Sequence, residues 1–277
     1  MLQEVLTRVA ALVALGLVVS TVVIIGRERL TATRAQWRSR VREAAPIGAV
    51  LGAVLLFNRV ARQELPAISW EYGINLTAVF YDIEGEFILW FQQYATPELT
   101  AYFTFIYVYA YAFMLVFPVL AYFALSDTRY LRELLAAYTL NYSIGLLFYV
   151  IVIAYGPRNW MIELLGETVL YENNPQYQWL TREVNRNVNV FPSLHTSLAA
   201  TVAVFAYRTR EMYTSWFPIA VFLAVSVAVS TMYLAIHWAT DVVAGLVLAY
   251  ASVAASKRLV GRWSLSDRLN GRLPFGD

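Results

Sequence analysis

Seven long apolar runs limit the folds open to this chain more than any other feature. A helix needs about 20 mainly apolar residues to cross a bilayer, where only helices and closed barrels satisfy their backbone hydrogen bonds. The runs are Val5–Ile25, Ala44–Val60, Ala101–Leu125, Leu131–Ala154, Ser193–Tyr207, Ser215–Ile236 and Trp238–Ser256. They predict an all-α, polytopic bundle of transmembrane helices: a six-helix core preceded by one extra N-terminal helix. The second and fifth runs are short, and the fifth spans only if its first turn lies in a protein-lined cavity.

The composition supports a partner that is a lipid bilayer rather than a nucleic acid. Hydrophobic residues make up 59% of the chain and charged residues only 14%, whereas soluble domains carry roughly 25% charged residues. A net charge of +2 gives no bulk attraction for polyanions. The absence of cysteine excludes disulfides, thiolate metal sites and cysteine nucleophiles. The sequence gives no indication of oligomeric state.

The basic residues predict the orientation, because Arg and Lys collect on the cytoplasmic side of a membrane. With the N-terminus outside, 15 of the 21 basic residues are cytoplasmic, whereas most acidic residues are external. The 15 are Arg27, Arg29, Arg34, Arg38, Arg40, Arg42, Arg129, Arg132, Arg208, Arg210, Lys257, Arg258, Arg262, Arg268 and Arg272. We therefore expect a multi-pass cell-membrane protein with its C-terminus in the cytoplasm. The first run lacks a basic start and a clear cleavage site, so it is predicted to be an uncleaved span.

This topology divides the chain into three parts. Residues 1–43 form an N-terminal transmembrane helix and a basic cytoplasmic loop, residues 44–256 a six-helix membrane domain, and residues 257–277 a basic cytoplasmic tail against anionic headgroups. Within the middle part, residues 62–100 mix aromatic and acidic side chains. That mixture predicts one or two amphipathic helices at the external interface. A spacer and a gate for lipid entry are both compatible with this segment.

The two histidines of the chain fall in one predicted layer with an acid. His195 opens the fifth run, His237 closes the sixth, and Asp241 lies four residues later in the seventh. Ionisable groups inside membrane segments are candidates for function and need partners. On continuous helix, residues four apart share a face, and a carboxylate would hold His237 in one tautomer with its other nitrogen left as a nucleophile. The alternative is that Asp241 only caps the seventh helix.

Four further residues are candidates for binding an anion, and specifically a phosphate. Ser193 is a good N-cap for the helix that follows it, and a helix N-terminus attracts anions. His195, in the first turn of that helix, would then lie where it protonates a leaving oxygen. Arg158 either forks onto phosphate oxygens or snorkels to the interface. Arg182 and Arg186, four residues apart, either bind phosphate or pair with neighbouring acids.

At these positions the sequence resembles the type-2 phosphatidic acid phosphatase and vanadium haloperoxidase superfamily. The family blocks are Lys-x6-Arg-Pro, Pro-Ser-Gly-His and Ser-Arg-x5-His-x3-Asp. The chain matches the second as Pro192-Ser193-Leu194-His195, and the third through Ser230-Thr231, His237 and Asp241. The first block is nearly absent: Gly156-Pro157-Arg158 stands there with no upstream Lys and with the Pro-Arg order reversed. Arg158 is therefore the first choice for the missing cations.

The details are closest to one branch, the inositol phosphorylceramide synthase-like group of inositolphosphotransferases. Members of that group also read Phe-Pro-Ser-Leu-His and Thr-Met-Tyr-Leu. In this chain these stretches are residues 191–195 and 231–234. Leu194 in place of Gly and Thr231 in place of Arg are departures shared with that branch.

The resemblance implies an integral-membrane lipid phosphatase or phosphotransferase that needs no metal and no cofactor. His237 would attack phosphorus to give a phosphohistidine, Asp241 would hold the reactive tautomer, and His195 would act as acid and then base. Ser193, Arg158 and backbone N–H groups would steady the phosphate oxygens. A water acceptor makes the enzyme a phosphatase, and an alcohol acceptor makes it a phosphotransferase, with the active site facing outside.

Two other classes of protein remain as alternatives. A metal-dependent membrane hydrolase would use His195, His237 and Asp241 as ligands, although the chain has no His-Glu-x-x-His helix. A non-enzymatic carrier would place its polar site near the bilayer midplane. The predicted polar residues gather instead at one interface, which argues against alternating access.

Overall fold

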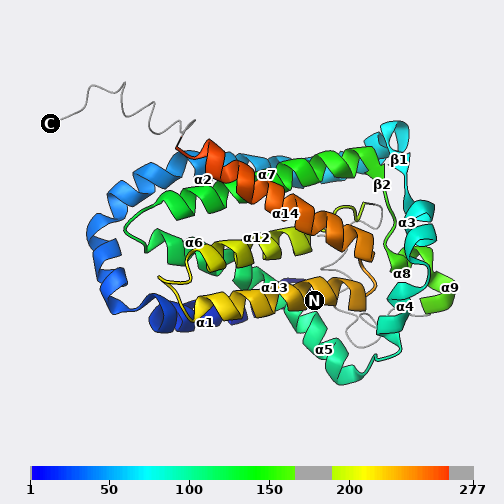
Figure 1. Cartoon of the computed structure of the whole chain (residues 1–277), viewed down its shortest axis with the longest axis horizontal. Coiled ribbons are helices and arrows are strands. Elements are labelled where there is room, and N and C mark those ends of the chain that lie inside the picture. The colour runs from blue at the N-terminus through cyan, green and yellow to red at the C-terminus, as the bar shows by residue number, and fades with distance from the viewer. Residues whose placement is uncertain (1, 166–188, 262–277) are drawn as a thin grey trace.

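The fold is a bundle of long helices (Figure 1), seen in a computed structural model that describes residues 2–165 and 189–261. Helix α5 (Pro97–Phe105) continues through the π-helical turn η2 (Ile106–Ala110) into α6 (Tyr111–Phe123). Helix α1 (Leu2–Ser20) ends in a similar turn, η1 (Thr21–Ile25). The longer helices are α1 (Leu2–Ser20), α2 (Arg27–Tyr72), α6 (Tyr111–Phe123), α7 (Arg129–Ile151), α12 (Leu194–Arg208), α13 (Trp216–Tyr233) and α14 (Ala239–Leu259). The predicted all-α bundle is confirmed.

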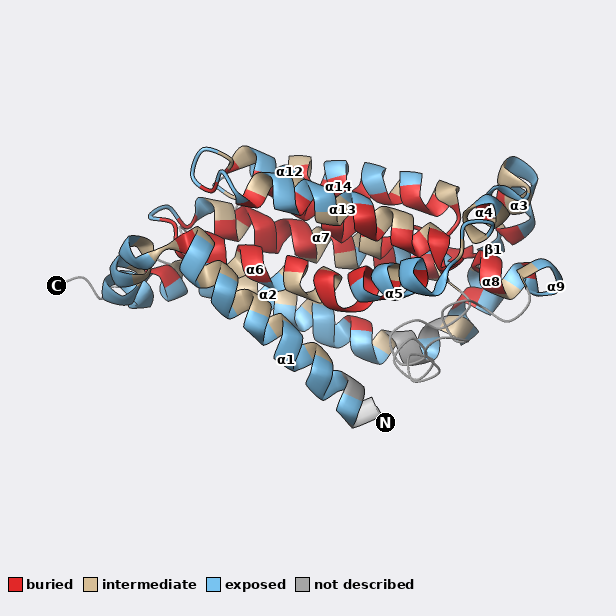
Figure 2. Cartoon of the chain, turned by 90° about the horizontal axis from the view of Figure 1, so that it is seen from below, coloured by how far each residue is buried: buried red, intermediate tan, exposed pale blue. Residues whose placement is uncertain are grey.

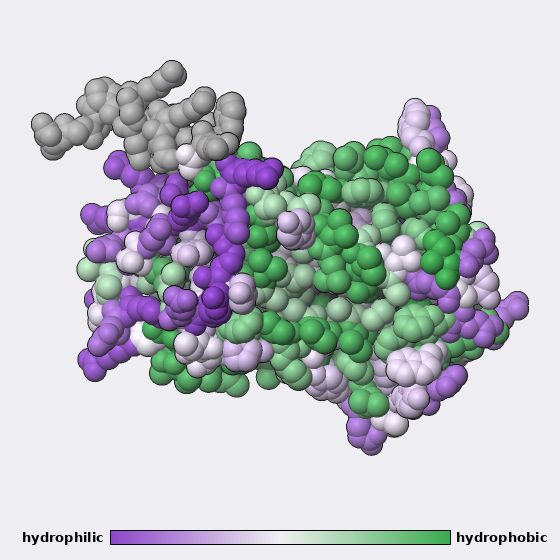
Figure 3. All heavy atoms as spheres, viewed as in Figure 1, coloured by the Kyte–Doolittle hydropathy of each residue, from purple (hydrophilic) through white to green (hydrophobic). Residues whose placement is uncertain are grey.

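Six helical stretches in the described part of the chain are long and apolar enough to cross a membrane. They are Leu6–Ile25, Arg27–Ala61, Pro97–Phe123, Arg129–Ile151, Trp216–Tyr233 and Ala239–Leu259. The face of the molecule in Figure 3 agrees with this, because a broad hydrophobic band separates hydrophilic residues at its two ends. The protein is therefore a multi-pass membrane protein.

The fifth apolar run forms the central helix of the bundle rather than a full-length span. Helix α12 has 15 residues, or about 22 Å of helix, which is short for a bilayer. It packs against α6, α7, α13 and α14. Its polar residue Thr201 is buried, and its hydroxyl accepts a hydrogen bond from Asn141 at 3.2 Å. Because four helices pack around it, its buried polar groups have protein partners that lipid does not offer.

The buried side chains concentrate where these central helices meet (Figure 2). Large aromatic residues fill this core, including Phe117 of α6, Phe205 of α12 and Trp216 of α13, all fully buried. Few residues of α1 and α2 are buried, and Figure 2 shows both helices largely exposed. Their apolar outer faces match a lipid environment.

The basic stretch at 27–43 is not the loop that the sequence predicts. Helix α2 runs without a break through this stretch and through the predicted boundary at 43/44. No glycine or proline interrupts residues 27–45, and the arginines and alanines there favour helix. Arg40 is buried and donates to the carbonyl oxygen of Phe123 at 2.8 Å, which ties α2 to the end of α6.

Residues 62–100 contain more elements than the one or two helices predicted. After α2 come β1 (Ile74–Asn75), α3 (Thr77–Glu84) and α4 (Phe87–Gln92), before α5 begins. Strand β1 pairs in parallel with β2 (Val152–Ile153). The helix of the fourth run therefore ends earlier than predicted, because its last β-branched residues extend to pair with β1.

Helices α12 and α14 approach closely at Gly245. A Cβ there would lie 2.6 Å from the carbonyl oxygen of Ser193 and 3.3 Å from the Cβ of Thr196. We expect Gly245→Ala to lower the free energy of unfolding by about 1–3 kcal/mol, since the backbone must shift. Thermal unfolding in one detergent measures this effect.

The matched control is Gly48→Ala in α2. A Cβ at Gly48 would meet no heavy atom within 4 Å, so alanine is expected to leave stability unchanged or raise it by up to about 1 kcal/mol. Equal unfolding temperatures for the two variants would contradict the close approach at Gly245.

Candidate active site

His237 lies in the turn between α13 and α14, not on a continuous helix. Helix α13 ends at Tyr233, and Ala235 adopts the left-handed conformation with φ of 51°. The backbone N–H of His237 donates to the carbonyl oxygen of Thr231 at 3.1 Å. The expectation that His237 and Asp241 lie on one continuous helix is therefore wrong, because the chain turns sharply at Ala235 before α14 begins.

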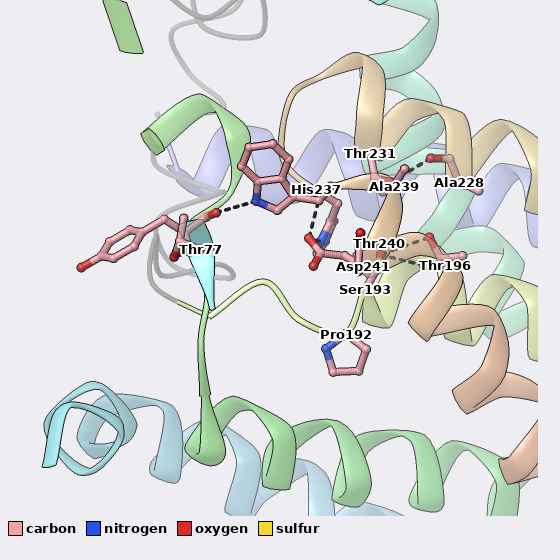
Figure 4. Close-up of polar contacts among 12 residues, drawn as sticks. Thr77, Pro192, Ser193, Thr196, Ala228, Thr231, His237, Ala239, Thr240 and Asp241 are labelled. Carbon is pink, nitrogen blue, oxygen red and sulfur yellow. Dashed lines mark hydrogen bonds and ion pairs between the residues drawn. The ribbon is translucent and has the colours of Figure 1, made fainter. Parts of the chain in front are cut away.

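The predicted pairing of His237 with Asp241 nevertheless forms (Figure 4). Nδ1 of His237 lies 3.3 Å from Oδ2 of Asp241, and the two side chains are 2% and 0% exposed. The same Oδ2 accepts the backbone N–H of Trp238 at 2.9 Å. Asp241 thus orients the imidazole and also caps α14. The pairing with His237 and the helix cap, which the sequence left as alternatives, are both present. With Nδ1 engaged, Nε2 is the nitrogen left for chemistry.

His195 faces the same site from the first turn of α12. Its ring centroid lies 6.4 Å from that of His237. The prediction that His195, His237 and Asp241 lie close together is therefore confirmed. The His195 ring is half-buried and lies 4.5 Å from the ring of Tyr107 and 4.4 Å from that of Tyr111. Neither tyrosine belongs to a sequence motif that predicts the site, although their spacing of four residues places them on one helical face.

Ser193 joins the start of α12 to the start of α14. Its hydroxyl accepts the N–H of Thr196 at 3.3 Å, which confirms Ser193 as the N-cap of α12. Its own backbone N–H donates to the carbonyl oxygen of Asp241 at 3.0 Å. Figure 4 shows Ser193, Thr196 and Asp241 grouped beside His237. The second and third sequence motifs are thereby linked by the backbone.

Arg158 lies in the short helix α8 (Pro157–Trp160), which packs on the turn that carries His237. The backbone N–H of Arg158 donates to the carbonyl oxygen of Ala235 at 2.9 Å. A Cβ on Gly156 would lie only 2.3 Å from the carbonyl oxygen of Ile236, so a glycine permits this approach. The Arg158 residue is 6% exposed, which differs from a side chain that snorkels at the surface. The other two candidates, Arg182 and Arg186, lie outside the described residues.

The next feature is the set of possible metal ligands among the described residues. Among residues 2–165 and 189–261, no group of three or more His, Cys, Asp or Glu side chains is arranged to hold a metal ion. His237 and Asp241 are also paired with each other. The site contains two imidazoles and a carboxylate, which come from the first turn of α12, the turn before α14 and the first turn of α14.

A membrane-helix bundle with this site fits the class of membrane phosphatases. A family model, the PAP2 superfamily, matches residues 77–255, and the chain belongs to that superfamily. The matched region contains Arg158, Ser193, both histidines and Asp241. No curated protein and no solved structure matches the chain.

Proposed function

We propose that this protein is a lipid phosphatase or phosphotransferase that acts through a phosphohistidine at His237. The observation that carries this proposal is the buried His237–Asp241 pair with the His195 ring 6.4 Å away. One imidazole is suited to attack and the other to proton transfer, as two-step phosphoryl transfer requires. Membership of the PAP2 superfamily supports this chemistry.

In the first step Nε2 of His237 forms a bond to phosphorus as the bond between phosphorus and the lipid oxygen breaks. Protonated His195 gives its proton to the departing lipid oxygen, which leaves as an alcohol. Asp241 stabilises the charge that develops on the His237 ring, because its carboxylate lies against Nδ1.

In the second step the acceptor replaces His237 on phosphorus. Neutral His195 removes a proton from water or from an alcohol, whose oxygen bonds to phosphorus as the P–N bond breaks. Water gives inorganic phosphate from a lipid monophosphate, or the phosphorylated head group from a phosphodiester lipid, and an alcohol gives a new phosphate ester. Resemblance to the inositol phosphorylceramide synthase-like branch favours transfer to an alcohol over hydrolysis.

The phosphate oxygens need positive partners while the charge on them grows. We assign this role to the positive, N-terminal end of the α12 dipole, where Ser193 caps the helix, and to Arg158 beside the His237 turn. Arg182 and Arg186 remain candidates for the same role. Since Arg and Lys predict the orientation, we place this site on the extracytoplasmic side.

The test uses purified protein in detergent with phosphatidic acid, a polyprenyl phosphate and phosphatidylinositol, each with and without inositol. We expect at least one of these lipids to lose its phosphate group or head group, with turnover unchanged by EDTA and inhibited by vanadate, a mimic of pentavalent phosphorus. Mass spectrometry separates the two outcomes. Hydrolysis releases inorganic phosphate from a lipid monophosphate or inositol phosphate from phosphatidylinositol, whereas transfer gives a new phosphate ester of the added inositol.

Three results would contradict the proposal. Absence of any product from all three lipids would favour the carrier. Loss of activity in EDTA with recovery in zinc would favour the metal-dependent hydrolase. Activity unchanged by millimolar vanadate would argue against five-coordinate phosphorus, with four oxygens and the His237 nitrogen, in the reaction.

A further inference from the structure

Helix α3, whose sequence carries none of the recognised motifs, holds the N-terminus of α14 through Glu84. The two carboxylate oxygens of Glu84 accept the backbone N–H groups of Ala239, at 2.8 Å, and of Thr240. The residues lie more than 150 positions apart in the chain. The first N–H groups of any helix lack partners within the helix. Glu84 supplies two of those partners from outside it.

This arrangement divides the capping of α14 between two carboxylates. Oδ2 of Asp241 takes the N–H of Trp238 and lies against His237, while Glu84 takes the next two N–H groups. Without Glu84, the free N–H groups would compete with His237 for the Asp241 carboxylate, as an acidic residue in the first turn commonly binds such groups.

Helix α3 also contacts the other segments of the site. The Phe80 ring lies 5.2 Å from that of Phe191, next to Pro192 and Ser193, and the Tyr81 ring lies 6.3 Å from that of Trp238. At the start of α3, the Thr77 hydroxyl accepts the N–H of Tyr155 at 3.0 Å, three residues before Arg158. Each of the three segments that carry candidate site residues in the described part of the chain therefore meets α3.

We propose that Glu84 is a positioning residue. By accepting the N–H groups of Ala239 and Thr240, it leaves the Asp241 carboxylate in contact with His237. This inference rests on the proposed function and gives residues 62–100 a part in it: α3 fixes the geometry of the nucleophile. Glu84 acts through Asp241 and has no assigned contact with substrate.

The variants Glu84→Gln, Glu84→Asp and Glu84→Ala test the proposal in the full-length protein. Glutamine keeps the shape but offers one acceptor oxygen and no charge, whereas aspartate keeps the charge on a shorter side chain. We expect kcat for a lipid phosphate to fall about tenfold in Glu84→Gln and further in Glu84→Ala, with KM within about twofold. Glu84→Asp is expected to recover part of the loss.

Asp82→Asn is the matched control. Asp82 lies on the same helix, two residues from Glu84, and is exposed. Its replacement removes one negative charge from α3 but leaves the contact between Glu84 and α14 in place. Its kcat should equal that of the unmodified protein. Unfolding temperatures of all variants are measured in the same detergent, and kcat is expressed per folded protein.

The proposal fails if Glu84→Gln and Glu84→Ala keep kcat within twofold of Asp82→Asn. It also fails if aspartate recovers nothing, or if KM rises as far as kcat falls, since either result indicates a general structural role. If Glu84→Ala does not fold, the glutamine and aspartate variants decide. An unmodified protein with no activity on any lipid phosphate would refute the proposed function itself, which separates the two failures.

Discussion

The variant His237→Ala is expected to lose turnover of any lipid phosphate by at least about a thousandfold, the scale seen when a covalent nucleophile is removed. The chain has one other histidine, His195, whose ring packs against those of Tyr107 and Tyr111, whereas the Asp241 carboxylate lies against Nδ1 of His237. We therefore do not expect His195 to take over the attack. Release of phosphate or head group, followed over the first minutes of reaction, measures the loss.

Asp82→Asn serves as the control for this variant too, because it alters an exposed acid on α3. The unfolding temperature of His237→Ala shows whether the protein remains folded. Activity within tenfold of the control in a folded His237→Ala protein would exclude a phosphohistidine at this position.

The second large effect is expected at His195 and depends on the leaving group. With a lipid phosphate, whose alcohol leaves only when protonated, His195→Gln should lower kcat about 100- to 10,000-fold. With an aryl phosphate such as p-nitrophenyl phosphate, the departing phenolate needs no proton, so the loss should be much smaller in the first step. His237→Ala should lose activity on both substrates alike.

The comparison of the two substrates separates a proton donor from a residue that only shapes the site. If His195→Gln slows the first step, measured as formation of the phosphorylated protein, equally with lipid and aryl phosphates, His195 does not protonate the leaving group. Burst kinetics with the aryl phosphate add a check, because a slow second step should let the phosphorylated protein accumulate.

The apolar runs predicted most of the fold because burial in lipid demands length and hydrophobicity, which can be counted along a chain. The same count fails for α12. Its environment is other helices, and that cannot be seen from local hydropathy. It also fails for residues 27–43, where charge suggested a loop although the backbone is helical to Tyr72. Helix propensity, not charge, decides such a stretch.

The candidate site was predicted in part because its residues lie in short motifs. The spacing of His237 and Asp241 indicated a pair, and Ser193 before an apolar run indicated a cap. The left-handed turn at Ala235 and the carboxylate of Glu84 carry no comparable local signal. Glu84 reaches α14 from more than 150 residues away, a contact that a single sequence cannot reveal.

The most direct measurement is a rapid-quench experiment with a lipid phosphate labelled in its phosphate group. The protein is denatured in alkali, which preserves phosphoramidates, and the labelled peptide is identified by mass spectrometry. We expect label on Nε2 of His237, absent from His237→Ala and discharged in unmodified protein as product forms. Steady turnover by the unmodified protein with no label on His237 at any time would contradict the mechanism.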